Sequence, residues 1–255
     1  MPAGSYARAV TSPLPRPPAE HVERVLCVLA HPDDVDFGSG GTIATWTAAG
    51  TEVTYCIVTD GDAGGFDETP RDQMGPLRQA EQRAAAAAVG VTDVRFLGYP
   101  DGRLELTLDL RRHISRVIRQ VRPQRVLTTS PERMWDRIGA SHPDHLTVGE
   151  STLRAVYPDS RNPFAFPELL ADEGLDAWTV PEVWLSASPR ADHAVDVTGV
   201  VERKFAALHS HVTQVSHQPE GQLQGFVTGW MAQTARTHGL PEGRLAEAFH
   251  VVHTA

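Results

Sequence analysis

An apolar run at residues 25–30, VLCVLA, stops abruptly at a histidine, a proline and two aspartates, the tetrapeptide HPDD at 31–34. The run is short and rich in valine and leucine, and a turn residue follows it at once, so it predicts a buried β-strand. In open α/β folds, ligands bind at the carboxyl edge of a parallel sheet. We therefore expect the polar side chains of the tetrapeptide to lie where the chemistry takes place.

The same alternation of apolar strands and amphipathic stretches continues along the chain. It predicts strands at 25–29, 53–59, 94–98, 125–129 and 183–187, helices at 41–49, 74–89, 108–121 and 144–156, and two further helices with a closing extended segment in 200–255. Strands that alternate with helices form right-handed crossovers. The predicted fold class is therefore α/β: a Rossmann-like three-layer fold with a mostly parallel sheet, whose functional site we expect at the carboxyl edge of its strands.

Length and composition narrow the class of protein. A chain of 255 residues fits a single domain, which we expect at 21–255 behind a disordered proline-rich tail at 1–20. The proline-rich, acidic stretch 158–181 predicts a long loop over the sheet edge that could shape the pocket. A net charge of -9 argues against nucleic acid as a partner, because phosphate binding needs clustered lysine and arginine.

The sequence carries no targeting signal that we recognise. No stretch is long and apolar enough to span a bilayer, and the first twenty residues lack the apolar core of a signal peptide. Both cysteines, Cys27 and Cys56, lie inside apolar strand-like runs, where a thiol packs as a small hydrophobe. Two buried, reduced cysteines favour an intracellular, cytoplasmic protein. A homo-oligomer is compatible with the sequence.

The tetrapeptide at 31–34 has two interpretations. Pro32 stiffens the turn, so the side chains of His31 and Asp34 can point toward one spot, as metal chelation requires. Imidazole and carboxylate are what a catalytic zinc takes when one position is kept open for water. Alternatively, Asp33 and Asp34 cap a helix that begins near Gly41.

A second polar cluster, SHPDH at 141–145, follows the strand predicted at 125–129. If Pro143 is the first residue of a helix, His142 and His145 can share one face at an i, i+3 spacing. By itself the cluster is also typical of a solvent-exposed helix start. Because both clusters follow strands of one parallel sheet, they fall on the same edge, and we expect them to build one metal site.

The two clusters resemble the signatures of the LmbE-like, or PIG-L, family of de-N-acetylases, and the similarity covers most of the chain. Further matches are the segment TDGDAG at 59–64, Arg78, Glu81, Asp101, Gly102, Lys204, His211 and Gln214. Members of the family are Rossmann-like zinc amidohydrolases that remove acetyl groups from N-acetylglucosamine-type sugars. The resemblance implies a Zn²⁺ enzyme acting on a small-molecule N-acyl sugar or glycoconjugate. Fe²⁺ is an alternative metal, because geometry and availability matter as much as affinity.

The resemblance also implies roles for eight residues. Three would bind the metal, three would take part in the reaction and two would contact the sugar. The implied metal ligands are His31, Asp34 and His145; the catalytic residues are Asp33 as general base on the zinc-bound water, His142 as acid or electrostatic partner and Asp144 as orienting residue; the sugar contacts are Arg78 and Asp101. One departure is Ala140, where a mycothiol-pathway member of the family has a tyrosine.

The same residues make chemical sense without the family. A zinc ion lowers the pKa of its water to about 7 and polarises an amide carbonyl, and Asp33 can then take the proton. Identical chemistry would serve an amidase of a non-sugar small molecule or a thiol conjugate. A nucleotide-binding module with an inactive metal site is disfavoured, because Gly38, Gly40 and Gly41 lack the G-x-G-x-x-G spacing.

Some matched residues also have a purely structural interpretation. Arg78 lies three residues before Glu81 and could form a surface ion pair with it instead of touching the substrate. Lys204, His211 and Gln214 are interpreted as a packed, hydrogen-bonded helix face rather than as catalytic residues.

Overall fold

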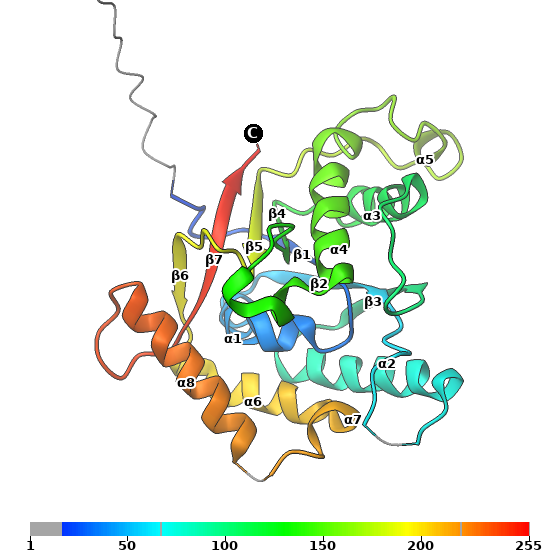
Figure 1. Cartoon of the computed structure of the whole chain (residues 1–255). Helices are drawn as coiled ribbons and strands as arrows, with labels where there is room; N and C mark the ends of the chain where they lie inside the picture. The colour runs from blue at the N-terminus through cyan, green and yellow to red at the C-terminus, as the bar shows by residue number, and fades with distance from the viewer. Residues whose placement is uncertain (1–16, 67, 220, 255) are drawn as a thin grey trace, which may run out of the picture.

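A computed structural model describes residues 17–66, 68–219 and 221–254, and its centre is a seven-stranded sheet (Figure 1). The strand order is β3-β2-β1-β4-β5-β7-β6; β1 to β5 are parallel, and β7 runs antiparallel between β5 and β6. The strands are β1 (Arg24–Leu29), β2 (Glu52–Thr59), β3 (Asp93–Tyr99), β4 (Arg125–Thr129), β5 (Glu182–Ser186), β6 (His193–Asp196) and β7 (Ala246–His253). The predicted Rossmann-like, mostly parallel α/β fold is confirmed.

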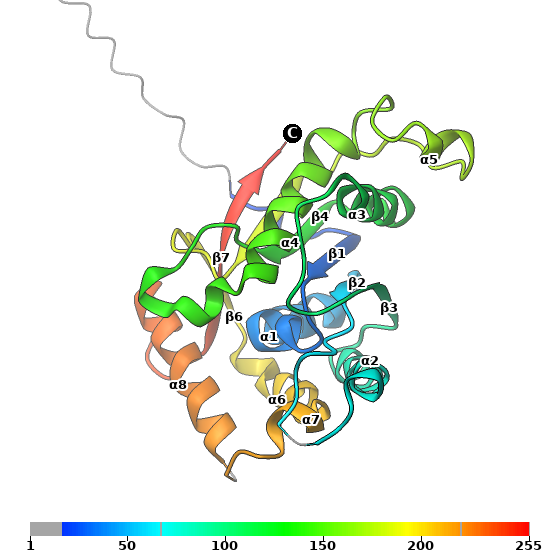
Figure 2. The same cartoon turned by 45° about the vertical axis from the view of Figure 1, so that its right-hand side comes forward.

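Helices cover both faces of the sheet. The helices α1, α2 and α6 pack on one face, and α3 and α4 pack on the other (Figure 2). Side chains of β1 alternate between the two cores, so that Cys27 faces the first and Val28 the second. The helices are α1 (Asp34–Ala48), α2 (Arg71–Ala88), α3 (Leu108–Val121), α4 (Pro143–Arg154), α5 (Glu168–Ala171), α6 (Val201–Ser210), α7 (Val212–Val215) and α8 (Gln222–Thr237), with the short turns η1 (Trp135–Ser141), η2 (Ala155–Asp159) and η3 (Thr198–Val200).

The helix predicted at 41–49 begins earlier than expected, at Asp34, directly after the turn that ends β1. Glycines at 38, 40 and 41 argue against a helix by propensity, but Gly41 is required by packing: a Cβ there would lie 2.7 Å from Cβ of Val197. Asp33 is the N-cap residue of this helix, but its side chain makes no capping hydrogen bond. The alternative in which Asp33 and Asp34 cap a helix that begins near Gly41 is therefore wrong.

The segment 158–181 does not shape the pocket. The helix α4 starts at the carboxyl edge of the sheet and ends at the opposite edge, so the segment that follows it lies there as well. It packs on α3, where Arg119 donates to the carbonyls of Asp159, Asn162 and Ala165. It also contains a short helix, α5, rather than only loop.

Three smaller expectations concern the termini, the cysteines and membranes. Residues 1–16 of the predicted tail lie outside the described residues. Both Cys27 and Cys56 are buried free thiols, as predicted. No helix in the described part of the chain is long and apolar enough to cross a membrane.

A buried ion pair is inserted into the hydrogen-bond ladder of α1. Nζ of Lys204, the only lysine of the sequence, donates to the carbonyls of Asp36 and Phe37 at 2.9 and 2.6 Å and to Oε1 of Glu247 at 2.6 Å. The carboxylate of Glu247 in turn accepts the backbone N–H groups of Gly41 and Thr42. Side chains inserted into a helix ladder bend the helix and fix its local geometry. The ion pair of Lys204 and Glu247 thereby fixes the position of the first turn of α1.

We expect Lys204→Met to lower the free energy of unfolding by about 3–5 kcal/mol, because it leaves Glu247 as an unpaired buried charge. Urea denaturation measures the change. The matched control is Arg244→Met, which removes an exposed ion pair with Asp196 and should cost less than about 1 kcal/mol. Equal losses in the two variants would contradict the inserted-pair interpretation.

Candidate metal and substrate site

The carboxyl ends of β1 and β4 form the switch point of the sheet. From β1 the sheet extends through β2 and β3 on one side and through β4 and β5 on the other. Ligands of open α/β sheets bind in the crevice at such a point. The HPDD turn leaves β1 here, and the SHPDH segment enters α4 here. The structure brings all eight sequence-predicted site residues to this edge.

Three side-chain donors converge beside the switch point. Nδ1 of His31 lies 3.2 Å from Nε2 of His145 and 3.3 Å from Oδ2 of Asp34. Nε2 of His145 lies 3.0 Å from Oδ1 of Asp34. Ligand atoms of a tetrahedral zinc, with bonds of about 2.0–2.2 Å, are roughly 3.3–3.5 Å apart. The three side chains, which we call the triangle, therefore approach one another at nearly the ligand spacing of a zinc shell, with His31 and His145 facing different oxygens of Asp34.

Two other donor sets around the same histidine also have metal-ligand spacing. They are His31 with His142 and His145, and His31 with Asp101 and Asp144. In the first set, Nδ1 of His142 already accepts the backbone N–H of Asp144 at 3.2 Å. The second set uses Nε2 of His31, which points away from His145. We favour the set that contains Asp34, because it unites two ring nitrogens and a carboxylate at contact distance.

The second ring nitrogen of His31 faces carboxylates. Nε2 lies 3.0 Å from Oδ1 of Asp101 and 3.2 Å from Oδ2 of Asp144. Metal-binding histidines usually donate their other N–H to such a group, which fixes the orientation of the ring. Asp144 also accepts the backbone N–H groups of Gly102 and Leu104, so it ties α4 to the loop after β3. Asp101, which we predicted as a sugar contact, has one oxygen turned toward His31.

Asp33 is held in an unusual backbone conformation next to the triangle. Its φ is 96°, a region that non-glycine residues rarely adopt and that recurs at functional sites. The backbone N–H of Asp33 donates to Oε1 of Gln82 at 2.8 Å, and its Oδ2 accepts from Arg78 at 3.1 Å. Burial raises the pKa of Asp33 to about 6, although the guanidinium of Arg78 acts in the opposite direction.

Arg78 is buried beneath the site rather than on the surface. Its guanidinium donates to the carbonyls of Pro32 and Gly61 and to Asp33. Gly61 leaves room for it, since a Cβ there would lie 2.6 Å from Nη1 of Arg78. The alternative of a surface ion pair with Glu81 is wrong. The carboxylate of Glu81 instead accepts from the backbone N–H and hydroxyl of Thr213.

His142 is the N-cap of α4 and stands beside the triangle. Its ring centroid lies 4.9 Å from that of His31 and 5.3 Å from that of His145. Burial and the two neighbouring histidines lower the pKa of His142. Because its Nδ1 accepts a backbone N–H, a neutral His142 carries its proton on Nε2.

The site carries more negative than positive charge, which favours the binding of a cation. Four carboxylates, of Asp33, Asp34, Asp101 and Asp144, meet one fixed cation, Arg78. Burial lowers the pKa of His31, but the surrounding carboxylates more than reverse this and raise it to about 12. A site that attracts a proton so strongly also attracts a metal ion, which competes for the same nitrogen. Charge and donor spacing therefore both fit a divalent metal.

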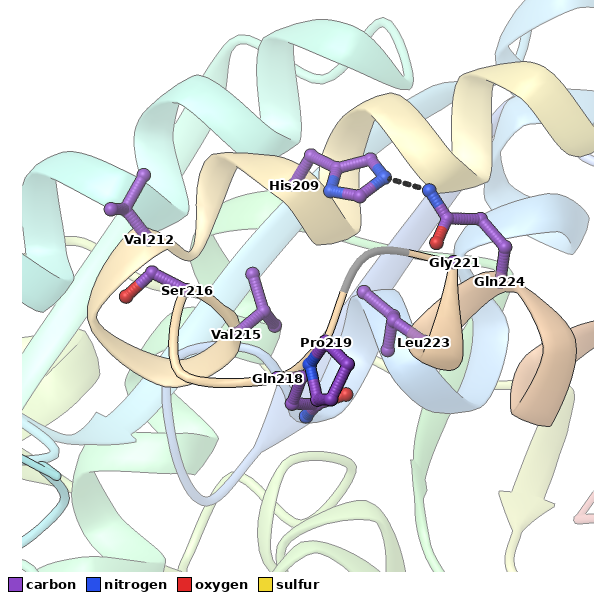
Figure 3. A pocket seen from close by; sticks show the side chains of 9 residues that line it. All are labelled: His209, Val212, Val215, Ser216, Gln218, Pro219, Gly221, Leu223 and Gln224. Atoms are coloured by element: carbon purple, nitrogen blue, oxygen red, sulfur yellow. Dashed lines mark hydrogen bonds between the residues drawn. The ribbon is translucent and has the colours of Figure 1, made fainter.

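A cavity of about 370 Å³ opens over these residues, and Arg78, Asp101, His142 and the backbone of Gly102 form part of its wall. A smaller cavity of about 270 Å³ lies between α6, α7 and α8, away from the switch point (Figure 3). The one titratable side chain in its described lining is His209, which is hydrogen-bonded to Gln224. We therefore assign the reaction to the cavity of about 370 Å³ that Arg78, Asp101 and His142 line.

Sequence analysis missed the residues that support Asp33. Gln82 bridges the backbone of Asp33 to Oδ2 of Asp36, and Nε2 of His211 contacts the same oxygen at 2.9 Å. Gln82 follows Arg78 by four residues on one face of α2, and both are buried. A polar i, i+4 pair on the alanine-rich face of a helix was the available signal. His211 and Lys204 are fully buried and hydrogen-bonded, as predicted. The three residues do not share one helix face, because Lys204 lies in α6, His211 follows its last residue, and the half-buried Gln214 lies in α7.

Comparison with known proteins agrees with this geometry. The sequence matches the family described as PIG-L, GlcNAc-PI de-N-acetylase, over residues 26–156. It is 33% identical over 198 residues to a diacetylchitobiose deacetylase of Thermococcus kodakarensis, covering 77% of this chain and 72% of that protein. It is 31% identical over 250 residues to the 1D-myo-inositol 2-acetamido-2-deoxy-alpha-D-glucopyranoside deacetylase of Rhodococcus erythropolis, covering 78% of this chain and 83% of that protein.

A solved structure of a deacetylase has a similar fold. The N,N'-diacetylchitobiose deacetylase of Pyrococcus horikoshii, in complex with its inhibitor MPG, superposes with a TM-score of 0.83 at 27% identity, covering 91% of this chain and 84% of that one. The family match spans half of the chain, and the sequence relatives exceed 30% identity over most of it. The chain therefore belongs to the PIG-L family of de-N-acetylases, enzymes that hydrolyse amides.

Proposed function

We propose that this protein is a zinc-dependent deacetylase that hydrolyses the N-acyl amide, in the first instance N-acetyl, of a glucosamine-type sugar or glycoconjugate. The observation that carries the proposal is the triangle of His31, Asp34 and His145 donors with the carboxylate of Asp33 beside it. The names of the relatives, which are deacetylases of chitobiose and of a glucosaminyl inositol, support the sugar.

In this proposal His31, Asp34 and His145 hold the metal, and Asp144 orients the ring of His31. A divalent metal, when bound there, polarises the amide carbonyl and makes a water acidic enough to attack at neutral pH. The donor set suits zinc, and Fe²⁺ is the alternative occupant.

The chain's own residues move the proton. Asp33 accepts a proton from the attacking water as the water oxygen bonds to the carbonyl carbon, and it returns that proton to the amine nitrogen as the C–N bond breaks. The products are a carboxylic acid and a free amine. His142 lines the cavity and, with Nδ1 tied to the backbone of α4, offers Nε2–H as a donor to the reacting amide. Arg78 and Asp101 are our candidates for contacts to the sugar hydroxyls.

Removing any of the three proposed ligands should abolish tight metal binding, because a site with two protein ligands is weak. We expect about one zinc per chain in the wild type and most of it lost in His31→Ala, Asp34→Ala and His145→Ala, as measured by plasma emission. The matched control is His113→Ala, which removes a histidine that is bonded to Tyr99 and does not line the cavity. Full zinc in Asp34→Ala together with its loss in His142→Ala would move the third ligand position to His142.

Asp33→Asn should separate metal binding from turnover. The amide keeps the size of the side chain but cannot accept the proton, so kcat should fall on the order of a hundredfold or more while zinc content stays normal. Asp60→Asn is the control, because the carboxylate of Asp60 accepts from Gln79 and lies outside the cavity. A parallel loss of zinc in Asp33→Asn would make Asp33 a ligand instead of the base.

The sugar itself is tested by acetate release from a panel of N-acetylglucosaminides, their deoxy analogues and N-acetylated amines without a sugar ring. A cavity that hydrogen-bonds a hydroxyl discriminates strongly against the analogue that lacks it, because a buried polar group is left unpaired. We expect kcat/KM for the glucosaminides to exceed that for the non-sugar amides by about a hundredfold or more. Equal values across the panel would favour an amidase of a non-sugar molecule.

A further inference from the structure

A second cavity, of about 420 Å³, adjoins the one that holds the proposed sugar site. His145 and Gly139 line both cavities, and Asp34 lines the second. The side chains that would hold the metal therefore stand at the boundary between two open spaces.

The two cavities differ in chemistry. The first is lined by charged and hydrogen-bonding groups such as Arg78 and Asp101. The second has a largely apolar wall that includes Phe37 of α1, Ala248 of β7, and Phe226 and Trp230 of α8. Phe226 and Trp230 are one helical turn apart, so they present their rings on one face of α8.

The aromatic wall is open to solvent in this structure. The side chain of Phe226 is 67% exposed, although an aromatic ring gains most when it is buried. The guanidinium of Arg137, on the η1 segment, lies 4.9 Å from the ring centroid of Trp230, and both residues line the cavity. Both views show the η1 segment beside α8 (Figures 1 and 2).

An amide carbonyl carbon carries its amine and its acyl chain on opposite sides. If the glucosamine ring lies in the polar cavity, the acyl chain points across the metal into the apolar one. We propose that the second cavity is an acyl-binding subsite that selects linear or arylalkyl acyl groups of at least four carbons over acetyl. The proposal rests on the proposed function, hydrolysis of an N-acyl glucosamine, and it makes a longer chain rather than acetyl the preferred acyl group.

The size of the cavity supports a group larger than acetyl. A water molecule takes about 30 Å³ of liquid volume, and the methyl group of acetyl is of similar size, so it would leave most of this space empty. Each methylene that enters such a wall from water should improve binding about fourfold. Gly38, which has no side chain, and Ala140, which has only a methyl group, line the cavity together with the proposed metal ligands Asp34 and His145 and so leave space beside them.

Gly38→Leu tests the subsite by filling it. A Cβ at Gly38 would meet only Cβ of Ser186, at 4.0 Å, so the first atom of the new side chain has room, and Gly38 lines the cavity that the leucine is meant to fill. The matched control is Gly225→Leu, an exposed glycine of α8 with nothing within 4 Å of its Cβ position and no part in either cavity.

The substrates are glucosamines with N-acetyl, N-butanoyl, N-hexanoyl and N-phenylacetyl groups. In the wild type and in Gly225→Leu we expect kcat/KM to be at least about tenfold higher for hexanoyl than for acetyl. Gly38→Leu should lower that ratio at least tenfold. The proposal is overturned if the ratio is unchanged in Gly38→Leu, or if the variant instead discriminates among aryl glycosides of N-acetylglucosamine, since the cavity would then hold the aglycone.

A binding measurement separates failure of this proposal from failure of the proposed function. Alkyl hydroxamates chelate zinc and need no sugar, so calorimetry with acetohydroxamate, hexanohydroxamate and phenylacetohydroxamate on the zinc-loaded protein probes the cavity alone. Affinity should rise with chain length in the wild type and in Gly225→Leu but not in Gly38→Leu or in Trp230→Ala. A flat series in the wild type overturns the acyl subsite even if N-acetylglucosaminides are hydrolysed. A rising series without hydrolysis of any acyl glucosamine keeps the subsite and rejects the sugar.

Discussion

The convergence of four carboxylates at one edge of the sheet is the constraint on which the rest of the site depends. Asp33 and Asp34 leave β1, Asp101 leaves β3 and Asp144 begins α4. Such a cluster is unfavourable out of water unless cations and hydrogen-bond donors satisfy it. Arg78 supplies one buried charge, and the nitrogens of His31 and His145 complete the donor set for a metal.

The helix α1 connects this cluster to the rest of the fold. Its first residue, Asp34, belongs to the proposed metal site, and the carbonyls of the first turn are bonded from behind by Lys204. A strained residue such as Asp33 persists only when its surroundings over-determine it. Gln82 and Arg78 of α2 provide that support through hydrogen bonds. The proposed base, Asp33, is therefore positioned by β1 and α1, between which it lies, and by α2.

Two cavities of opposite character meet at the proposed metal. The polar one is built from the ends of parallel strands and from α2, which belong to the Rossmann-like half of the molecule. The apolar one takes residues from β7 and α8 in the C-terminal part. The catalytic groups thus come from the Rossmann-like half, whereas the acyl cavity combines residues of that half, such as Phe37 and Gly38, with Phe226, Trp230 and Ala248 of the C-terminal part. Peripheral helices such as α8 can therefore vary specificity while the site on the sheet stays the same.

The sequence by itself determined the five parallel strands, the edge at which they deliver their polar residues, and the eight residues gathered there. Apolar runs of strand length and polar turns directly after them are local signals, and parallel topology places such turns together. The start of α1 at Asp34 was not predictable, because its glycines disfavour a helix, and one of them, Gly41, is needed to admit Val197 from another part of the chain. Only the tertiary structure decided the insertion of Lys204 and Glu247 into α1, the bridge of Gln82 and the apolar cavity under Phe226 and Trp230. Each of these features joins residues that are far apart in sequence. A local pattern of residues along the chain carries no information about such long-range contacts.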